Sequence, residues 1–352
     1  MAMRVRAHRW LRQMSGGAKA QLLGADDGHW YVTKFLNNPQ GRRILVNDLI
    51  GTVLLGRLGI ATPPVALVTV EDDFLQANAQ LMTGKYPLSA GQHFGSQYPG
   101  VPGALSIYDF FPDQLLPDLY NRSDFAGALV ADKWLSNADG RQSIFFRAQI
   151  APGDIRWVTY LIDNGYAFQG SEWAFHDALI QGVYARPVVY GRHVSMLTFA
   201  PWLDRLMALR PNTIDDLLDM VPPVWIRGDE QALEHLLRQL FARRTLVPQL
   251  IHEAVGLIKF KGATKPTLPP RVLMASTKGP CRRTNVGHSA NVRWRRGERP
   301  EVNGRSIGVD PKMRQPVKLK DKYIVLQKRF SRPNPKHFLH RWLNLSIRGL
   351  PG

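Results

Sequence analysis

Three charged residues have the types and the order that phosphate chemistry requires. Lys34 stands in the strand-like run Val32-Thr33-Lys34-Phe35, Asp139 in a polar loop, and Asp163 directly after a second apolar run. A lysine on a strand can neutralise nucleotide phosphates, while one carboxylate orients an attacking hydroxyl and another holds Mg²⁺ against the phosphates. Taken singly, each has a commoner explanation, a solvent-facing lysine or an aspartate in a turn. Their order along one chain favours the chemical interpretation.

A glycine turn and an acidic residue extend this set. Ser15-Gly16-Gly17 lies between two strand-like runs, and glycine leaves backbone N–H groups open to a phosphate, although such a tripeptide is more often an ordinary turn. Asp48 is the candidate partner for the ammonium group of Lys34. The predicted nucleotide-binding residues are therefore Ser15, Gly16, Gly17, Lys34 and Asp48.

The elements that carry the glycine turn, Lys34 and Asp48 are expected to form a small antiparallel sheet with one helix. A helix is expected over Arg42–Leu58, because Leu45, Leu49, Val53 and Leu54 form one apolar stripe that ends at Gly59. An Asp-Gly turn at 25–28 predicts a hairpin. Residues 91–103, rich in Gly and Pro, are expected to form a surface loop. The predicted strands are Arg9–Gln13, Ala18–Leu23, Trp30–Phe35, Ala66–Val70 and Phe74–Met82.

The second half of the chain is expected to be more helical. An apolar helix over Asp124–Ser136 precedes the Asp139 loop, and helices are predicted near Ile214–Met220 and Glu230–Arg243. Two β-rich runs, Ser143–Arg147 and Trp157–Ile162, are joined by a turn at 151–154 and predict a hairpin. A hairpin returns its two ends to the same edge, so Asp139 and Asp163 should approach each other although 24 positions separate them.

The chain has 352 residues and a formal net charge of +18, and all of this excess lies after residue 260. Residues 261–352 hold 22 Lys and Arg against 4 Asp and Glu, whereas residues 1–260 hold 24 of each. This basic tail has few periodic apolar positions, and we expect it to be disordered or ordered only on binding. Its Trp294, among arginines 293, 295 and 296, suggests nucleic-acid binding, with solvated charge as the commoner explanation.

Further function classes are excluded by what the sequence lacks. Cys281 is the only cysteine, which rules out an intramolecular disulfide and a cysteine-built metal site. No run approaches the roughly 18 apolar residues of a membrane helix, and no apolar segment follows the N-terminal arginines, so neither a membrane partner nor a secretory signal is expected. The cytoplasm is the expected compartment.

Four segments give the chain a specific resemblance. They are 15–22 (SGGAKAQL), 32–35 (VTKF), 132–142 (DKWLSNADGRQ) and 162–168 (IDNGYAF), and together they resemble the HipA-like kinase family over most of residues 1–260. The resemblance implies an α+β, two-lobed protein-kinase-like fold, with a nucleotide-binding lobe over 1–85, a catalytic lobe over 86–260 and the basic tail over 261–352. It also implies ATP and Mg²⁺ as ligands and transfer of phosphate to a serine or threonine hydroxyl, on a protein substrate.

Position by position, Lys34 resembles the phosphate-binding lysine, Asp139 the catalytic aspartate and Asp163 the metal-binding aspartate. Arg141 either neutralises phosphate charge in the catalytic centre or caps the loop. The chain departs from the kinase pattern at Asp48, where a longer glutamate is usual, and at Ile144, where a metal-binding asparagine is usual. Asn137, Gln142 or Ser143 could replace that asparagine, and Asn137 is the best placed because it shares the loop with Asp139.

Two alternatives to an active phosphotransferase follow from these departures and from the tail. Ile144 and Asp48 suggest a nucleotide-binding pseudokinase that serves as a protein-interaction module. The charge of residues 261–352 suggests a nucleic-acid binder.

Overall fold

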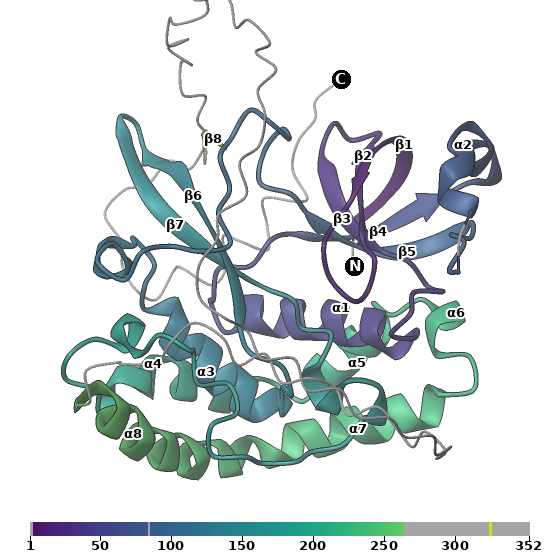
Figure 1. Ribbon diagram of the computed structural model, residues 1–352. Coiled ribbons are helices and arrows are strands. Elements are labelled where there is room, and N and C mark those ends of the chain that lie inside the picture. Colours follow the sequence, from purple (N-terminus) through teal and green to yellow (C-terminus); the bar gives the residue numbers. More distant parts are fainter. Residues whose placement is uncertain (1–2, 84, 264–323, 326–352) are drawn as a thin grey trace, which may run out of the picture. The chain divides into compact units, whose positions relative to one another are not determined.

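A closed β-barrel forms the N-terminal part of the protein (Figure 1). The computed structural model describes residues 3–83, 85–263 and 324–325. The barrel order is β1 (Met3–Gln13), β2 (Gln21–Ala25), β3 (Trp30–Lys34), β5 (Gly91–Gln97) and β4 (Val65–Val70). All neighbours are antiparallel except β1 and β4, which pair in parallel. The predicted small antiparallel sheet is thus a closed barrel with one parallel pair, because the 11-residue β1 is long enough to pair with β4 through its first half and with β2 through its second.

The side chains of strand β3 alternate between buried and partly exposed positions, as the sequence predicts. Tyr31 and Thr33 are fully buried, whereas Trp30, Val32 and Lys34 are partly exposed on the opposite face. The Asp-Gly hairpin before it is confirmed, since Gly28 has a φ of +80° and donates its N–H to the carbonyl of Ala25 over 3.0 Å. The alternation keeps the Lys34 side chain out of the barrel core.

Two predictions around the barrel were wrong. Residues 74–82 form α2 (Asp72–Ala77) and the 3₁₀ turn η1 (Ala79–Met82) instead of a strand, because two aspartates in the first turn suit a helix N-terminus. Residues 91–97 form β5 instead of a surface loop. A Cβ on Gly95 would lie 2.5 Å from Cγ2 of Val68, so a glycine that reads as a loop signal is required here by close strand packing.

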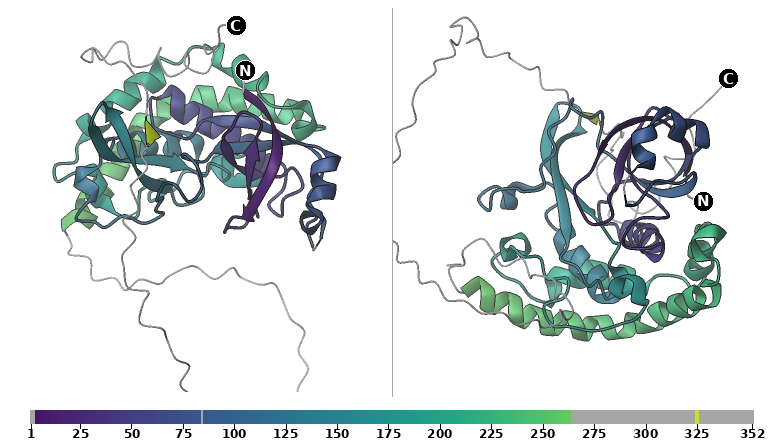
Figure 2. Two further views of the ribbon diagram at one scale, coloured as in Figure 1. Left: turned by 90° about the horizontal axis from the view of Figure 1, so that it is seen from above. Right: turned by 45° about the vertical axis from the view of Figure 1, so that its right-hand side comes forward.

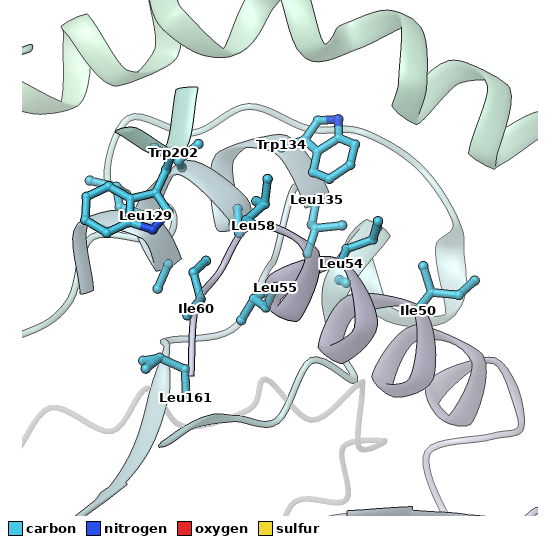
Figure 3. Close-up of a cluster of buried hydrophobic side chains, with 14 of the residues drawn as sticks. Ile50, Leu54, Leu55, Leu58, Ile60, Leu129, Trp134, Leu135, Leu161 and Trp202 are labelled. Carbon is cyan, nitrogen blue, oxygen red and sulfur yellow. The ribbon is translucent and has the colours of Figure 1, made fainter. Parts of the chain in front are cut away.

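Helix α1 (Arg43–Arg57) lies between the barrel and the helical part, and confirms the helix predicted there. It packs against β4 and β5 on one side and against α3 (Asp124–Leu135) on the other. Figure 3 shows the apolar side chains at this junction, where Leu54 of α1 lies near Leu135 and Leu161 lies near Ile60. Gly59 ends the helix with a φ of +77°. This continuous core fixes α1, and with it Asp48, relative to the barrel.

The predicted hairpin is confirmed as β6 (Gln142–Ala151) and β7 (Asp154–Ile162), which pair antiparallel and place Gln142 opposite Ile162. A two-residue strand of the tail, β8 (Ile324–Val325), pairs in parallel with β6 at Ala148 and Gln149. Tail residues 264–323 and 326–352, for which disorder was predicted and which include Trp294 with its neighbouring arginines, lie outside the described residues.

The rest of the described chain is mainly helical, as Figure 2 shows from two further directions. Helices α5 (Thr213–Leu218) and α7 (Glu230–Ala242) confirm two predictions, whereas α4 (Met196–Met207), α6 (Pro223–Ile226) and α8 (Val247–Ala263) were not predicted. Short 3₁₀ turns connect them: η2 (Leu116–Asp118), η3 (Ala167–Glu172), η4 (Pro187–Tyr190) and η5 (Arg243–Leu246). The described residues thus combine separate β-rich and helical regions, in agreement with the predicted α+β class.

Among the described residues, no helix is long and apolar enough to span a membrane.

Candidate active site

Lys34 forms two ion pairs that join three elements. Its Nζ lies 2.7 Å from Oδ2 of Asp48 on α1 and 2.9 Å from Oδ1 of Asp163, the residue that follows β7. Only 12% of the Lys34 side chain and 2% of the Asp48 side chain are exposed, whereas 31% of the Asp163 side chain is open to solvent. The short side chain of Asp48 reaches the lysine because the packing of α1 on β4 and β5 brings the helix close to β3.

Asp48 also holds the backbone after Asp163. Its Oδ1 accepts the N–H of Asn164 over 2.9 Å, and the Asn164 side chain donates to Oγ1 of Thr52 on the same helix. A Cβ on Gly51 would lie 2.6 Å from Cβ of Asn164, so glycine is needed for this close approach. Asn164 was not among the predicted site residues, although its place directly after Asp163 was a usable signal.

The carboxylate of Asp163 is held in a defined orientation. The backbone of Asp163 has a left-handed φ of +61°. This conformation is uncommon for residues other than glycine and costs of order 1 kcal/mol or more. Oδ1 accepts from Lys34 and from the N–H of Gly165, while Oδ2 accepts from Nε2 of Gln142 over 3.0 Å. The register of β6 and β7 explains the last contact, because Gln142 lies opposite Ile162.

The three charges shift one another's pKa values. Burial raises the pKa of Asp48 to about 6, although the charge of Lys34 opposes this rise. Burial would lower the pKa of Lys34, but the carboxylates of Asp48 and Asp163 outweigh it and raise that pKa above its ordinary value. Burial would likewise raise the pKa of Asp163, yet Lys34 holds it below its ordinary range. Lys34 and Asp163 are therefore both charged near neutral pH.

Arg141 is buried behind the site. Its Nε and Nη2 bind the carboxylate of Asp132, a fully buried residue of α3, with Nε 3.0 Å from Oδ2. Its Nη1 donates to the carbonyl of Ile162 over 3.1 Å and to Oδ1 of Asn164 over 3.0 Å. Because every guanidinium nitrogen is engaged inside the protein, this arrangement favours loop capping over neutralisation of phosphate. Asp132 is a site-supporting residue that the sequence reasoning missed.

The loop 137–140 meets the segment after Asp163. The N–H of Ala138 donates to the carbonyl of Tyr166 over 2.9 Å, so the two ends of the hairpin are close, as the sequence predicts. Asp139 is exposed, and its Oδ1 accepts the N–H of Gly140 over 2.8 Å. Asn137 is only 1% exposed: its Nδ2 donates to Asp132 and its Oδ1 accepts the N–H of Asp139. Asn137 thus shapes the loop from inside.

The glycine turn lies against the same segment. A Cβ on Gly17 would be 2.7 Å from Nε2 of Gln40, and that Nε2 donates to the hydroxyl of Tyr166 over 3.2 Å. Gly16 has a φ of +118°, and Ser15 stands beside it in the turn between β1 and β2. The structure therefore connects the turn with the segment after Asp163, through Gln40.

A buried asparagine of α1 fixes the backbone beyond Asp163. Nδ2 of Asn47 donates to the carbonyls of Gly165, Ala167 and Gly170 at 2.8 to 3.0 Å, and its Oδ1 accepts from Nε1 of Trp173. Trp173 is only 9% exposed, so this contact is buried. The sequence reasoning missed Asn47, although a polar residue in an otherwise apolar stretch of a helix was a usable signal.

The donor set fits a Mg²⁺ ion that arrives with a nucleotide. Among the described residues, no group of three or more His, Cys, Asp or Glu side chains is placed to hold a metal by itself. Mg²⁺ usually binds one or two protein carboxylates and completes its shell with phosphate oxygens and waters. The partly exposed carboxylate of Asp163, beside the amide of Gln142, supplies that kind of partial shell.

No protein-family model matches the chain, and no curated protein matches it either. Solved structures that resemble it include a Helicobacter pylori proinflammatory kinase, CtkA, at 10% identity and a TM-score of 0.41, over 72% of this chain and 99% of that one. A Golgi casein kinase is similar at 11% identity and a TM-score of 0.37, over 75% of each chain. The Golgi casein kinase with Mn/ADP bound is similar at 11% identity and a TM-score of 0.32, over 74% of each chain.

Proposed function

We propose that the protein is an ATP-dependent phosphotransferase, resembling HipA-like serine/threonine kinases, that transfers the γ-phosphate to a hydroxyl of a protein substrate. The observation that carries this proposal is the pair of contacts from Lys34 to Asp48 and Asp163. It joins a strand lysine, a helix carboxylate and a partly exposed carboxylate at one point, the arrangement that kinase chemistry uses for phosphate and metal.

In this proposal the fold has two lobes. The barrel and α1 form the nucleotide-binding lobe, which extends past residue 85 because β5 completes the barrel. The hairpin and the helices after it, to about residue 260, form the catalytic lobe. Lys34 and Asp48 belong to the first lobe, and Asp139 and Asp163 to the second. The basic tail, residues 261–352, stands apart from both.

The roles of the charged residues follow from their surroundings. Lys34 binds nucleotide phosphate oxygens through its ammonium group, which Asp48 orients from behind. Asp163 holds the metal, because its carboxylate is charged at neutral pH and partly open to solvent. Bound Mg²⁺ supplies charge neutralisation for the phosphates. The Ser15-Gly16-Gly17 turn offers its N–H groups to the same phosphates.

Asp139 orients the acceptor hydroxyl. Its side chain is exposed, while the contacts from Ala138 to Tyr166 and from Asn137 to Asp132 hold the loop in place. The carboxylate can accept a hydrogen bond from the hydroxyl that attacks the phosphate, and can take its proton as the phosphate–oxygen bond forms. Arg141 then serves as a positioning residue, because it ties α3 to the segment around Asp163.

A second candidate function is a nucleotide-binding pseudokinase. One observation favours it: Ile144, at the usual position of a metal-binding asparagine, is an apolar residue of β6 paired with Tyr160. Such a protein would bind nucleotide without turnover and act through its surface. Nucleic-acid binding by the tail is a further candidate from charge alone, and its residues lie outside the described part of the chain.

Transfer of labelled phosphate from [γ-³²P]ATP, to the protein itself and to a generic protein acceptor, tests the proposal. We expect incorporation by the wild type and a loss of about 100-fold or more in Asp139→Asn. Asp154→Asn, at the exposed tip of the hairpin, is the matched control and should keep full incorporation. Nucleotide binding without incorporation would favour the pseudokinase, and equal incorporation by all variants would contradict the role of Asp139.

A further inference from the structure

We propose that Gln142 is the second protein ligand of the metal, in the role that typical kinases give to an asparagine five positions after the catalytic aspartate. This inference rests on the proposed function, since it names a further ligand for the same Mg²⁺. In this chain the position five residues after Asp139 is Ile144, which has no oxygen in its side chain to offer.

The other residues considered for this role are engaged elsewhere. Asn137 is buried, with its Nδ2 bound to Asp132 and its Oδ1 bound to the N–H of Asp139. Ser143 is 6% exposed, and its Oγ lies 3.0 Å from the hydroxyl of Tyr184. Among the described residues neither side chain is hydrogen-bonded to Asp163, and each would have to give up its present hydrogen bonds to bind a metal held there.

Gln142 alone among these candidates combines exposure with contact to Asp163. It is the first residue of β6, and its partner across the hairpin is Ile162, the residue before Asp163. Its Nε2 lies 3.0 Å from Oδ2 of Asp163, and its side chain is open to solvent. The antiparallel register thus places the side-chain amide of Gln142 next to the carboxylate of Asp163.

The separation of these two atoms suits a shared metal. A half-turn of the terminal amide exchanges Oε1 and Nε2, which have nearly the same size and shape. Two oxygens on neighbouring corners of an octahedral Mg²⁺ shell lie about 2.9 Å apart, because each is about 2.0–2.1 Å from the ion. The 3.0 Å between Nε2 and Oδ2 is close to that separation. A metal can therefore replace the hydrogen bond without backbone movement.

The charges around Asp163 also favour a metal next to Oδ2 over a metal next to Oδ1. Oδ1 already accepts from the ammonium group of Lys34 and from the N–H of Gly165. A divalent cation next to Oδ1 would face the charge of Lys34, whereas Oδ2 faces the neutral amide of Gln142. A metal at this site would therefore be held by Oδ2 of Asp163 and Oε1 of Gln142, and the ion pairs of Lys34 would stay in place.

Mn²⁺ in place of Mg²⁺, with ADP present, allows the ligand role to be measured without turnover. Electron paramagnetic resonance gives the Mn²⁺ affinity, and line broadening in ¹⁷O-water gives the number of waters on the ion. We expect Gln142→Met to weaken Mn²⁺ binding about tenfold and to add one bound water. Gln149→Met, on the same strand, is the matched control and should change neither quantity. Gln142→Glu keeps an oxygen and should keep the wild-type number of waters.

The possible outcomes separate this inference from the proposed function. If the wild type and Gln142→Met bind Mn²⁺ with the same affinity and with the same number of bound waters, Gln142 is not a metal ligand. That result would leave the proposed kinase function unaffected. A weaker affinity with unchanged hydration also overturns the ligand role, since Gln142 would then act only by orienting Asp163. A wild type that binds no Mn²⁺ with ADP overturns both proposals. The melting temperature of each variant establishes that the measured chains are folded.

Discussion

The ammonium nitrogen of Lys34 lies 2.7 Å from Oδ2 of Asp48, so strand β3 and helix α1 are joined by a buried ion pair. The other oxygen of Asp48 binds the N–H of Asn164, next to Asp163. One carboxylate therefore positions the lysine and, through the backbone, the residue proposed to hold the metal.

Ionisation of Asp48 should lower the stability of the protein as the pH rises from about 4 to about 6. Burial raises the pKa of this carboxyl to about 6 in the folded protein, while the unfolded value is about 3.9. In this window the folded state binds more protons than the unfolded state, so the free energy of unfolding falls with increasing pH. The Asp163 carboxyl, whose pKa is lowered, works in the opposite direction at lower pH.

Asp48→Asn isolates this contribution. The free energy of unfolding from urea denaturation, wild type minus variant, should decrease between pH 4 and pH 6 by no more than about 3 kcal/mol, the free energy of about two pKa units. Asp73→Asn, at the exposed start of α2, serves as the control for the replacement of an aspartate by asparagine. A difference for Asp48→Asn that rises with pH would contradict the raised pKa.

Arg141→Met should destabilise the protein by about 3–5 kcal/mol, because it leaves Asp132 as a buried charge without its cation. The exposed pair of Arg156 and Asp154 provides the matched comparison, and Arg156→Met should cost about 1 kcal/mol or less. Denaturant unfolding measures both. Equally small losses of unfolding free energy in both variants would show that the buried pair of Arg141 and Asp132 contributes no more to stability than the exposed pair.

Gly51→Ala and Gly56→Ala should have opposite effects although both lie on α1. A methyl group at Gly51 would meet Cβ of Asn164 at 2.6 Å, whereas at Gly56 the nearest atom is Oγ1 of Thr62 at 3.8 Å. We expect a loss of about 1–3 kcal/mol for Gly51→Ala from overpacking, and a gain of up to about 1 kcal/mol for Gly56→Ala from the helix preference of alanine. Thermal unfolding distinguishes them, and a stabilised Gly51→Ala would contradict the close contact of α1 with Asn164.

Periodicity in the sequence was enough to predict the elements that carry the proposed site. The stripe of Leu45, Leu49 and Leu54 marks α1, and the alternation from Trp30 to Phe35 marks β3, because each buries one face. Strand β5 was missed for a physical reason. Its packing depends on Gly95 lying close to Val68, and a glycine inside a strand looks like a loop in sequence alone.

The supporting residues of the site were harder to predict than its charged residues. The order of Lys34, Asp139 and Asp163 is visible along the chain, and the hairpin argument brings the last two together. In contrast, the pairing of Arg141 with Asp132 and the three carbonyl contacts of Asn47 arise only when α1, α3 and the segment after β7 pack together. Local sequence patterns do not specify such tertiary contacts.

Titration of Mg²⁺·ATP into the wild type and into Lys34→Met by calorimetry measures whether the protein binds nucleotide and whether Lys34 contributes to that binding. Lys85→Met, which changes an exposed lysine, is the matched control, and circular dichroism establishes that each variant is folded. We expect saturable, Mg²⁺-dependent binding to the wild type and to Lys85→Met. The affinity of Lys34→Met should be lower by at least about tenfold, since a charge-assisted contact to phosphate contributes about 1.5–3 kcal/mol. Binding of equal affinity to all three proteins, or no binding to the wild type, would contradict this expectation.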